Sequence, residues 1–257
     1  MAPVQAVTFD LWDTVFLDDS DEPKRRSLGL PPKKVERRDL VARFLSDAGG
    51  PADRAAIDRV YDETDAEFRR VWHDEHSTWT VADRLRRVLA ALERDLPPGR
   101  FVELVRLHED MELRVRPDLV AGADGSLRAL RRRWPLIAVS DAIFSPGRAL
   151  RELLAGYGLL DCFAGFVFSD ECGRSKPAPE VFRQAASLVP CRVEELVHVG
   201  DREHNDVAGP HAVGARAVLV TAGLDRGSAT TKADAVCKRF QDLEGIITSL
   251  DGAGGPP

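Results

Sequence analysis

The chain has 257 residues, of which 44% are hydrophobic and 30% are charged, as expected for a globular protein with a substantial apolar core. Its net charge of −6 argues against a nucleic-acid partner, whose phosphates need a basic face. No apolar run approaches the roughly 20 residues that cross a bilayer, and the N-terminus lacks the pattern of a signal peptide. We therefore expect a cytoplasmic protein, and we expect its four cysteines, which form no CxxC pair, to be free thiols.

The first third of the chain contains one short strand pattern followed by polar and then helical sequence. Residues 4–9 are β-rich and end at Asp10. Residues 18–38 carry many charges and three prolines, which predicts a loop or a mobile insertion. From about residue 39 to residue 116 apolar residues recur at helical spacing, which predicts a small all-helical module.

The rest of the chain alternates short apolar runs with helical patterns. The runs are 136–139, 166–168, 196–199 and 217–220, and the helical patterns are 145–157, 179–189 and 205–213. This alternation is typical of a parallel sheet with helices on both faces. We predict an α/β fold, a three-layer Rossmann-like parallel-sheet core (1–16 and 117–250) with an inserted all-helical cap domain (17–116) and a C-terminal tail (251–257).

Several polar side chains follow predicted strands. Asp10 follows the first strand, Ser140 and Asp141 follow the second, and Asp201 follows another. In open parallel sheets the carboxyl ends of the strands form the ligand crevice, so these groups should converge. Acidic groups that meet in this way favour a cation, and Mg²⁺ suits carboxylates combined with phosphate oxygens. Lys176 is the only lysine between residues 34 and 232, which is a weak sign of a site that needs a compact ammonium.

Four stretches in this order resemble the motifs of the haloacid dehalogenase superfamily, whose members are mostly phosphatases. They are FDLWDT at 9–14, VSD at 139–141, GRSKPAPEVF at 173–182 and HVGDREHNDVAG at 198–209. Each motif is short, but all four in order after expected strands form a specific signal. The resemblance covers the predicted core, whereas the insert fits the superfamily's cap only by its position and helicity.

The resemblance implies a role for each matching residue. Asp10 would be the nucleophile that forms an aspartyl-phosphate, and Lys176 would pair with it. The phosphate would be held by Thr14, by the Ser140 hydroxyl and by the backbone N–H of Asp141. A Mg²⁺ ion would be held by the remaining set, which is Asp10, the backbone carbonyl of Trp12, Asp201 and Asp206.

One position departs from the phosphatase pattern. Superfamily phosphatases usually carry a second Asp, a general acid, where this chain has Trp12, and Asp13 points elsewhere unless the backbone changes. True haloacid dehalogenases have an aromatic residue there, but they generally lack the first acid of the fourth motif, which is present here as Asp201. The change is also compatible with substrates that have good leaving groups, or with an acid from the insert, where the histidines are His73, His76 and His108.

The sequence therefore predicts a Mg²⁺-dependent hydrolase that acts on a small phosphorylated metabolite through an aspartyl-phosphate. Two alternatives remain: a haloacid dehalogenase that acts through an aspartyl ester, and a weakly active or non-catalytic phosphate-binding protein. The expected partner is a small-molecule substrate, with neither nucleic acid nor a membrane involved. The sequence leaves the oligomeric state open.

Overall fold

A six-stranded parallel sheet forms the centre of the molecule, in the order β3-β2-β1-β4-β5-β6. The computed structural model describes residues 2–51 and 53–252. All five predicted strands are present. A sixth strand, β6, was not predicted, because it has only three residues and two of them are half-buried. The strands are β1 (Ala6–Phe9), β2 (Leu136–Ser140), β3 (Phe163–Phe168), β4 (Leu196–Gly200), β5 (Arg216–Val220) and β6 (Ala235–Cys237).

Helices cover both faces of this sheet, which confirms the predicted three-layer α/β core. On one face Val7 and Phe9 join an apolar cluster with side chains of α7 (Ala123–Leu130), α8 (Gly147–Gly156) and α12 (Leu243–Gly252). On the other face Ala6 and Ile137 pack with α10 (Pro179–Ser187). The apolar runs of β1, β2, β4 and β5 are buried throughout, which is why they form continuous hydrophobic stretches instead of alternating ones.

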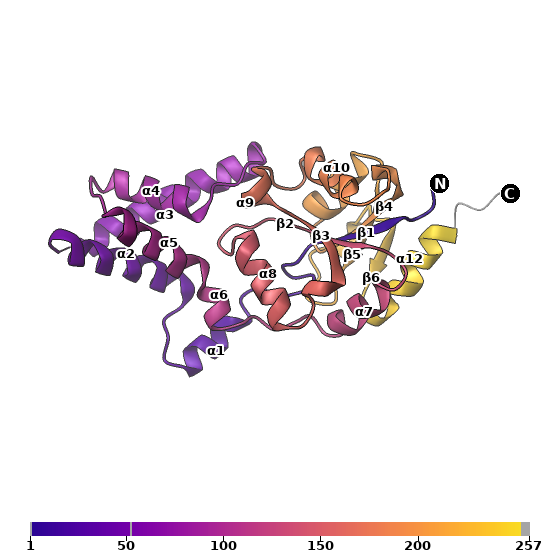
Figure 1. Cartoon of the computed structure of the whole chain (residues 1–257), viewed down its shortest axis with the longest axis horizontal. Coiled ribbons are helices and arrows are strands. Elements are labelled where there is room, and N and C mark those ends of the chain that lie inside the picture. Colours follow the sequence, from indigo (N-terminus) through magenta and orange to yellow (C-terminus); the bar gives the residue numbers. More distant parts are fainter. Residues whose placement is uncertain (1, 52, 253–257) are drawn as a thin grey trace.

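Residues 33–109 form four helices with an apolar core of their own, and we call them the helical module. They lie beyond the end of the sheet, at the left of Figure 1. Their buried core includes Phe44, Ile57, Leu85 and Leu104, one from each helix, separate from the clusters around the sheet. The helices are α2 (Lys33–Gly49), α3 (Arg54–Asp74), α4 (Val81–Ala91) and α5 (Pro98–Glu109).

The predicted loop at 18–38 is wrong, because much of this segment is helical. It contains α1 (Asp21–Ser27) and the start of α2. Several of its charges are buried in ion pairs: Arg25 contacts Glu36, and the Lys33 ammonium lies 2.8 Å from the Asp21 carboxylate. Charged side chains can be buried when they are paired in this way, and a polar pattern alone does not reveal the pairing.

Short elements complete the chain. They are α6 (Met111–Arg114), α9 (Ser169–Cys172), α11 (Gly209–His211), the π-helical turn η3 (Glu203–Ala208), and the 3₁₀ turns η1 (Leu160–Cys162), η2 (Val193–Glu195), η4 (Ser228–Thr230) and η5 (Phe240–Asp242). The helix expected at 205–213 is thus η3 followed by α11. Asp251 and Gly252, expected in the tail, end α12, and the Asp251 carboxylate accepts the N–H of Val4 at 2.7 Å. The rest of the expected tail, 253–257, lies outside the described residues.

Two expectations about the chain as a whole can be compared with this fold. All four cysteines lie among the described residues and are free thiols, as expected. No helix within 2–51 and 53–252 has the length and apolar character needed to cross a membrane.

Candidate active site

The carboxyl ends of three neighbouring strands bring the predicted site residues to one edge of the sheet. Asp10 directly follows β1, Ser140 ends β2 and Asp201 directly follows β4. Lys176 joins them from the loop between α9 and α10 and is 3% exposed. The convergence expected from the strand order is therefore present in the fold.

The Asp10 carboxylate is held by two donors. The Lys176 ammonium lies 2.7 Å from its Oδ1, and the Ser140 hydroxyl donates to the same oxygen at 3.0 Å. Burial raises the pKa of Asp10, and the attraction of Lys176 opposes this effect. An ammonium and a hydroxyl aimed at one carboxylate oxygen fix its direction, as a nucleophile requires.

A buried chain of polar contacts continues from Lys176 away from Asp10. Lys176 lies 2.6 Å from the Asp206 carboxylate, whose Oδ1 is also 3.0 Å from His198 Nε2. His198 Nδ1 in turn lies 2.7 Å from the Thr8 hydroxyl. Burial opposes ionisation of Asp206, yet Lys176 and His198 keep its pKa well below the usual range. Asp206 is thereby held as a carboxylate.

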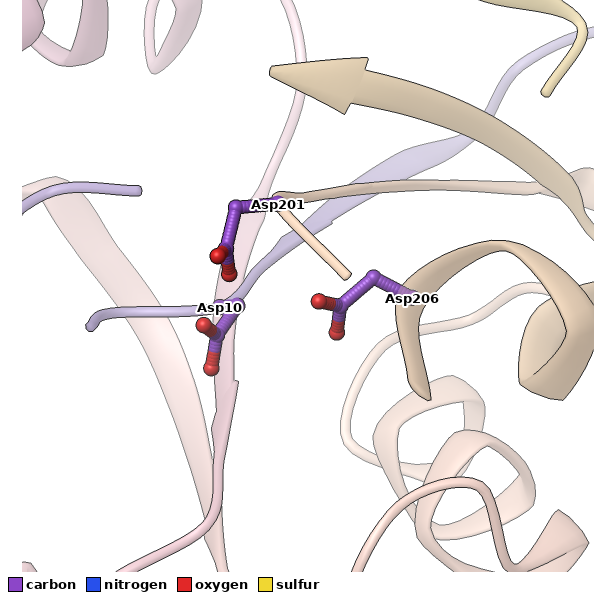
Figure 2. A group of neighbouring side chains, drawn as sticks. All are labelled: Asp10, Asp201 and Asp206. Atoms are coloured by element: carbon purple, nitrogen blue, oxygen red, sulfur yellow. The ribbon is translucent and has the colours of Figure 1, made fainter. Parts of the chain in front are cut away.

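Three carboxylates form a group that fits a divalent cation. Asp10, Asp201 and Asp206 each offer one oxygen, and these oxygens lie within 4.8 Å of one another (Figure 2). Burial raises the pKa of Asp201 to about 7, with repulsion from Asp10 and Asp206 adding to it. Asp201 Oδ1 is buried and has no hydrogen-bond partner among the described residues. An orphaned oxygen in a crowded acidic group suits a hard cation that prefers oxygen ligands.

A cavity of about 230 Å³ opens over Asp10. Its lining residues come from both the sheet edge and the helical module: Asp10, Trp12, Asp18, Trp72, Glu112, Asp141, Ile143, Phe144, Ser145, Lys176, Arg202, Asn205 and Asp206. Trp12 is thus part of the cavity wall. Thr14 is buried outside this lining, and its hydroxyl makes no hydrogen bond to the described residues.

Asp141 lies in the cavity wall, with its carboxylate turned toward neighbouring donors. Its Oδ1 accepts the backbone N–H of Lys176 at 3.0 Å, and its Oδ2 accepts from the Asn205 side chain at 3.2 Å. Burial raises the pKa of Asp141 to about 7. These bonds tie the second, third and fourth motifs together, a contact that the sequence did not suggest.

The three histidines of the insert are absent from the cavity lining. His108 is buried in the helical module, where its ring bonds to the Tyr61 hydroxyl and the Leu104 carbonyl, both at 2.8 Å. His73 and His76 pack instead near His204, at ring-centroid distances of 5.6 and 6.2 Å. None of the three histidines therefore lines the cavity over Asp10, although His73 and His76 line a small neighbouring cavity that shares Lys176 with it.

The sequence analysis missed Arg226, which binds two acids of the site. Its Nε donates to Asp201 Oδ2 at 2.6 Å, and its guanidinium also contacts the Asp13 carboxylate. Asp13 therefore faces Arg226, which is consistent with the expectation that it does not replace the acid missing at Trp12. Arg226 lies in the loop after β5. Because ligand sites form beyond the carboxyl ends of parallel strands, its position in that loop could have identified it as a candidate site residue.

Gly200 gives the fourth motif a close approach that only glycine allows. A Cβ at this position would lie 2.3 Å from Asp206 Cγ. We expect Gly200→Ala to lower the free energy of unfolding by roughly 1–3 kcal/mol, because the neighbours must shift to admit the methyl group. Gly125→Ala is the matched control: it lies in α7 with nothing within 4 Å of the added carbon, so it should stabilise by up to about 1 kcal/mol. Urea unfolding measures both, and equal effects would contradict the crowding argument.

Known proteins resemble the chain in sequence. A family model described as a haloacid dehalogenase-like hydrolase matches residues 4–214. Over 109 residues the chain is 37% identical to a phosphoserine phosphatase of Thermus thermophilus, covering 37% of this chain and 44% of the relative. Over 115 residues it is 33% identical to the human haloacid dehalogenase-like hydrolase domain-containing protein 3, covering 45% of each chain. These alignments thus span about half the length of the curated relatives.

Solved structures resemble the whole chain in fold. A 2-haloacid dehalogenase from Pseudomonas syringae pv. Tomato superposes with a TM-score of 0.70 at 22% identity, covering 96% of this chain and 99% of that one. A "HAD phosphatase" from Thermococcus onnurineus superposes with a TM-score of 0.55 at 22% identity, covering 95% and 98%. At these identities the likeness establishes the fold, and both chemistries occur on it.

Proposed function

The chain belongs to the haloacid dehalogenase-like hydrolases, and on this premise we propose that it is a Mg²⁺-dependent phosphatase of a small phosphorylated metabolite that acts through an aspartyl-phosphate. The observation that carries the proposal is the group of Asp10, Asp201 and Asp206, with an orphaned oxygen on Asp201. A carboxylate nucleophile that attacks carbon has no need of a cation, whereas a phosphate has charge to be neutralised. Relatives that are named phosphatases support the same choice.

The residues of the site have separate tasks in this proposal. Asp10 attacks phosphorus with the carboxylate that Lys176 and Ser140 orient. Lys176 and the Ser140 hydroxyl also stabilise charge on the phosphoryl oxygens. Asp10, Asp201, Asp206 and the backbone carbonyl of Trp12 are the proposed Mg²⁺ ligands. When bound, the ion neutralises phosphate charge and lowers the repulsion between the phosphate and Asp10. Thr14 and the N–H of Asp141 complete the proposed phosphate contacts.

We propose that residues 17–116 act as a cap over the core formed by residues 1–16 and 117–250. Trp72 of α3 lines the cavity above Asp10. Arg84 of α4 donates to the carbonyl of Ile143 at 3.3 Å, a contact between the helical module and the loop after β2. The cavity is smaller than the roughly 300–1,000 Å³ of typical ligand sites, which favours a small substrate.

A panel of substrates tests the function. We expect phosphate release from phosphate monoesters in the presence of Mg²⁺, at least tenfold above the rate in EDTA. Halide release from 2-haloacids, assayed in parallel without metal, should stay at background. Metal-independent halide release would replace the proposal with dehalogenation. The aromatic residue at Trp12, which true haloacid dehalogenases share, is the specific reason to test for this outcome. No turnover of either class would leave a phosphate-binding protein.

A further inference from the structure

The cavity over Asp10 contains more carboxyl groups than the proposed metal site uses. Its lining includes five: Asp10, Asp18, Glu112, Asp141 and Asp206. Trp12 occupies the place of the usual general acid, so the leaving oxygen of a substrate needs a proton from elsewhere. The contacts of these five groups show which of them is available to supply it.

Four of the five carboxyl groups are already engaged. Asp10 and Asp206 share the Lys176 ammonium, and Asp141 accepts two N–H donors as described above. Glu112 lies 3.2 Å from the Lys33 ammonium and accepts from a buried serine hydroxyl at 2.9 Å. Asp10 is the proposed nucleophile, and the other three groups have both oxygens engaged by donors, so none has a free oxygen from which to pass a proton to the leaving group.

Asp18 differs from the other four. It has no cationic partner within 4 Å among the described residues, and only its Oδ1 accepts a hydrogen bond, from the N–H of Asp19 at 2.9 Å. Neighbouring protein atoms displace part of the water around Asp18 and so raise its pKa; the charge of Asp19 adds to this effect and that of Lys33 opposes it. Its other oxygen is therefore available, and its protonated form is favoured relative to an ordinary Asp.

Asp13 holds Asp18 in this position. The backbone of Asp13 is in the left-handed region, with φ of 54°, and its Oδ1 accepts the N–H of Asp18 at 3.0 Å. The guanidinium of Arg226 holds the other oxygen of Asp13. The carboxylate beside Trp12 therefore serves as a brace for the backbone of Asp18, at the wall of the cavity.

We propose that Asp18 is the acid–base residue of the reaction, which rests on the phosphatase function proposed above. As the Asp10 oxygen bonds to phosphorus and the ester P–O bond breaks, the Asp18 carboxyl gives its proton to the leaving alcohol oxygen. The resulting Asp18 carboxylate then takes a proton from water as the water oxygen attacks phosphorus. The Asp10–phosphorus bond breaks, inorganic phosphate leaves, and both aspartates regain their starting forms.

The test compares Asp18→Asn with the unchanged chain on alkyl phosphates and on p-nitrophenyl phosphate. Loss of the acid should lower kcat/KM for alkyl esters by roughly 10²–10⁴-fold. The p-nitrophenolate group leaves without a proton, so one equivalent per site should be released in a fast burst, followed by slow turnover because water activation is also lost. Asp47→Asn is the matched control: this aspartate near the end of α2 is 55% exposed, lies outside the cavity lining and pairs with Arg100.

Each outcome separates the two proposals. If Asp18→Asn and Asp47→Asn behave alike on every ester while the unchanged chain releases phosphate, the assignment of Asp18 is wrong and the phosphatase stands. If Glu112→Gln instead shows the loss confined to alkyl esters, Glu112 is the acid. If the unchanged chain releases phosphate from no ester, both proposals fail. Asp18 is exposed, and Asn keeps the oxygen that accepts the N–H of Asp19, so the variant should fold. Melting curves of Asp18→Asn and of Asp18→Ala check that both variants are folded.

Discussion

Asp10→Asn should abolish phosphate release, with kcat reduced on the order of 10⁴-fold or more. The amide is a poor nucleophile, so no aspartyl-phosphate can form, and the other residues retain only binding and charge stabilisation. Initial rates of phosphate release measure the effect, and acid quenching with a substrate that carries radioactive phosphorus checks that the covalent intermediate is missing. Asp47→Asn, which changes an exposed carboxylate outside the cavity, is the control that should keep its rate.

The same variant should not lose stability in EDTA. Burial gives Asp10 a pKa above that of the unfolded chain, so its ionisation weakens the fold as pH rises through that raised pKa. At neutral pH the amide removes this cost and the repulsion from Asp201 and Asp206. A melting temperature equal to or above that of the unchanged chain is expected. Retained turnover in the soluble variant would remove Asp10 from the reaction.

Removal of Mg²⁺ should have the second large effect, both on turnover and on stability. The carboxylates of Asp10, Asp201 and Asp206 repel one another without a cation, and binding to the folded state alone adds stability as RT ln(1 + [Mg²⁺]/Kd). At 100 times Kd this amounts to about 2.7 kcal/mol. A Mg²⁺ titration followed by thermal melting in the absence of substrate gives a readout independent of activity.

Asp201→Asn supplies the comparison for the metal. It keeps the shape of the side chain but removes a charge from the group, and Asp201 carries the orphaned oxygen. We expect the Mg²⁺-induced rise in melting temperature to disappear or to require much higher Mg²⁺. Asp170→Asn removes a carboxylate on α9, outside the group of three acids, and should leave the Mg²⁺-induced rise in melting temperature intact. If both variants respond to Mg²⁺ as the unchanged chain does, the three carboxylates are not the metal site.

The core of this molecule could be predicted from the sequence because its strands are buried on both faces. Such strands read as short apolar runs, and the polar residues that end them, Asp10, Ser140 and Asp201, follow at once. The order of motifs then placed Lys176 and Asp206 beside them. These are properties of local sequence together with a general rule about the edges of parallel sheets.

The parts that were missed depend on pairings between distant segments. Arg226 binds Asp13 across 213 residues, and the helices at 21–27 and 33–49 rest on buried ion pairs, which look like solvated charge in the sequence. The position of Asp18 depends on the bond to Asp13 and on a left-handed backbone at a non-glycine residue, which no pattern signals. Pairing of this kind becomes visible only when the chain is folded.

The place of β1 between β2 and β4 has a consequence for how the chain is assembled during synthesis. The strand that occupies the middle of the sheet is the first one to be translated, and its partner Val199 is separated from Phe9 by about three quarters of the chain. All residues of the helical module are synthesised long before β4. Its contacts are local, and local contacts form faster than distant ones. Asp10 therefore lies at the end of an incompletely paired strand until β4 has been made, and the candidate site is assembled only late in synthesis.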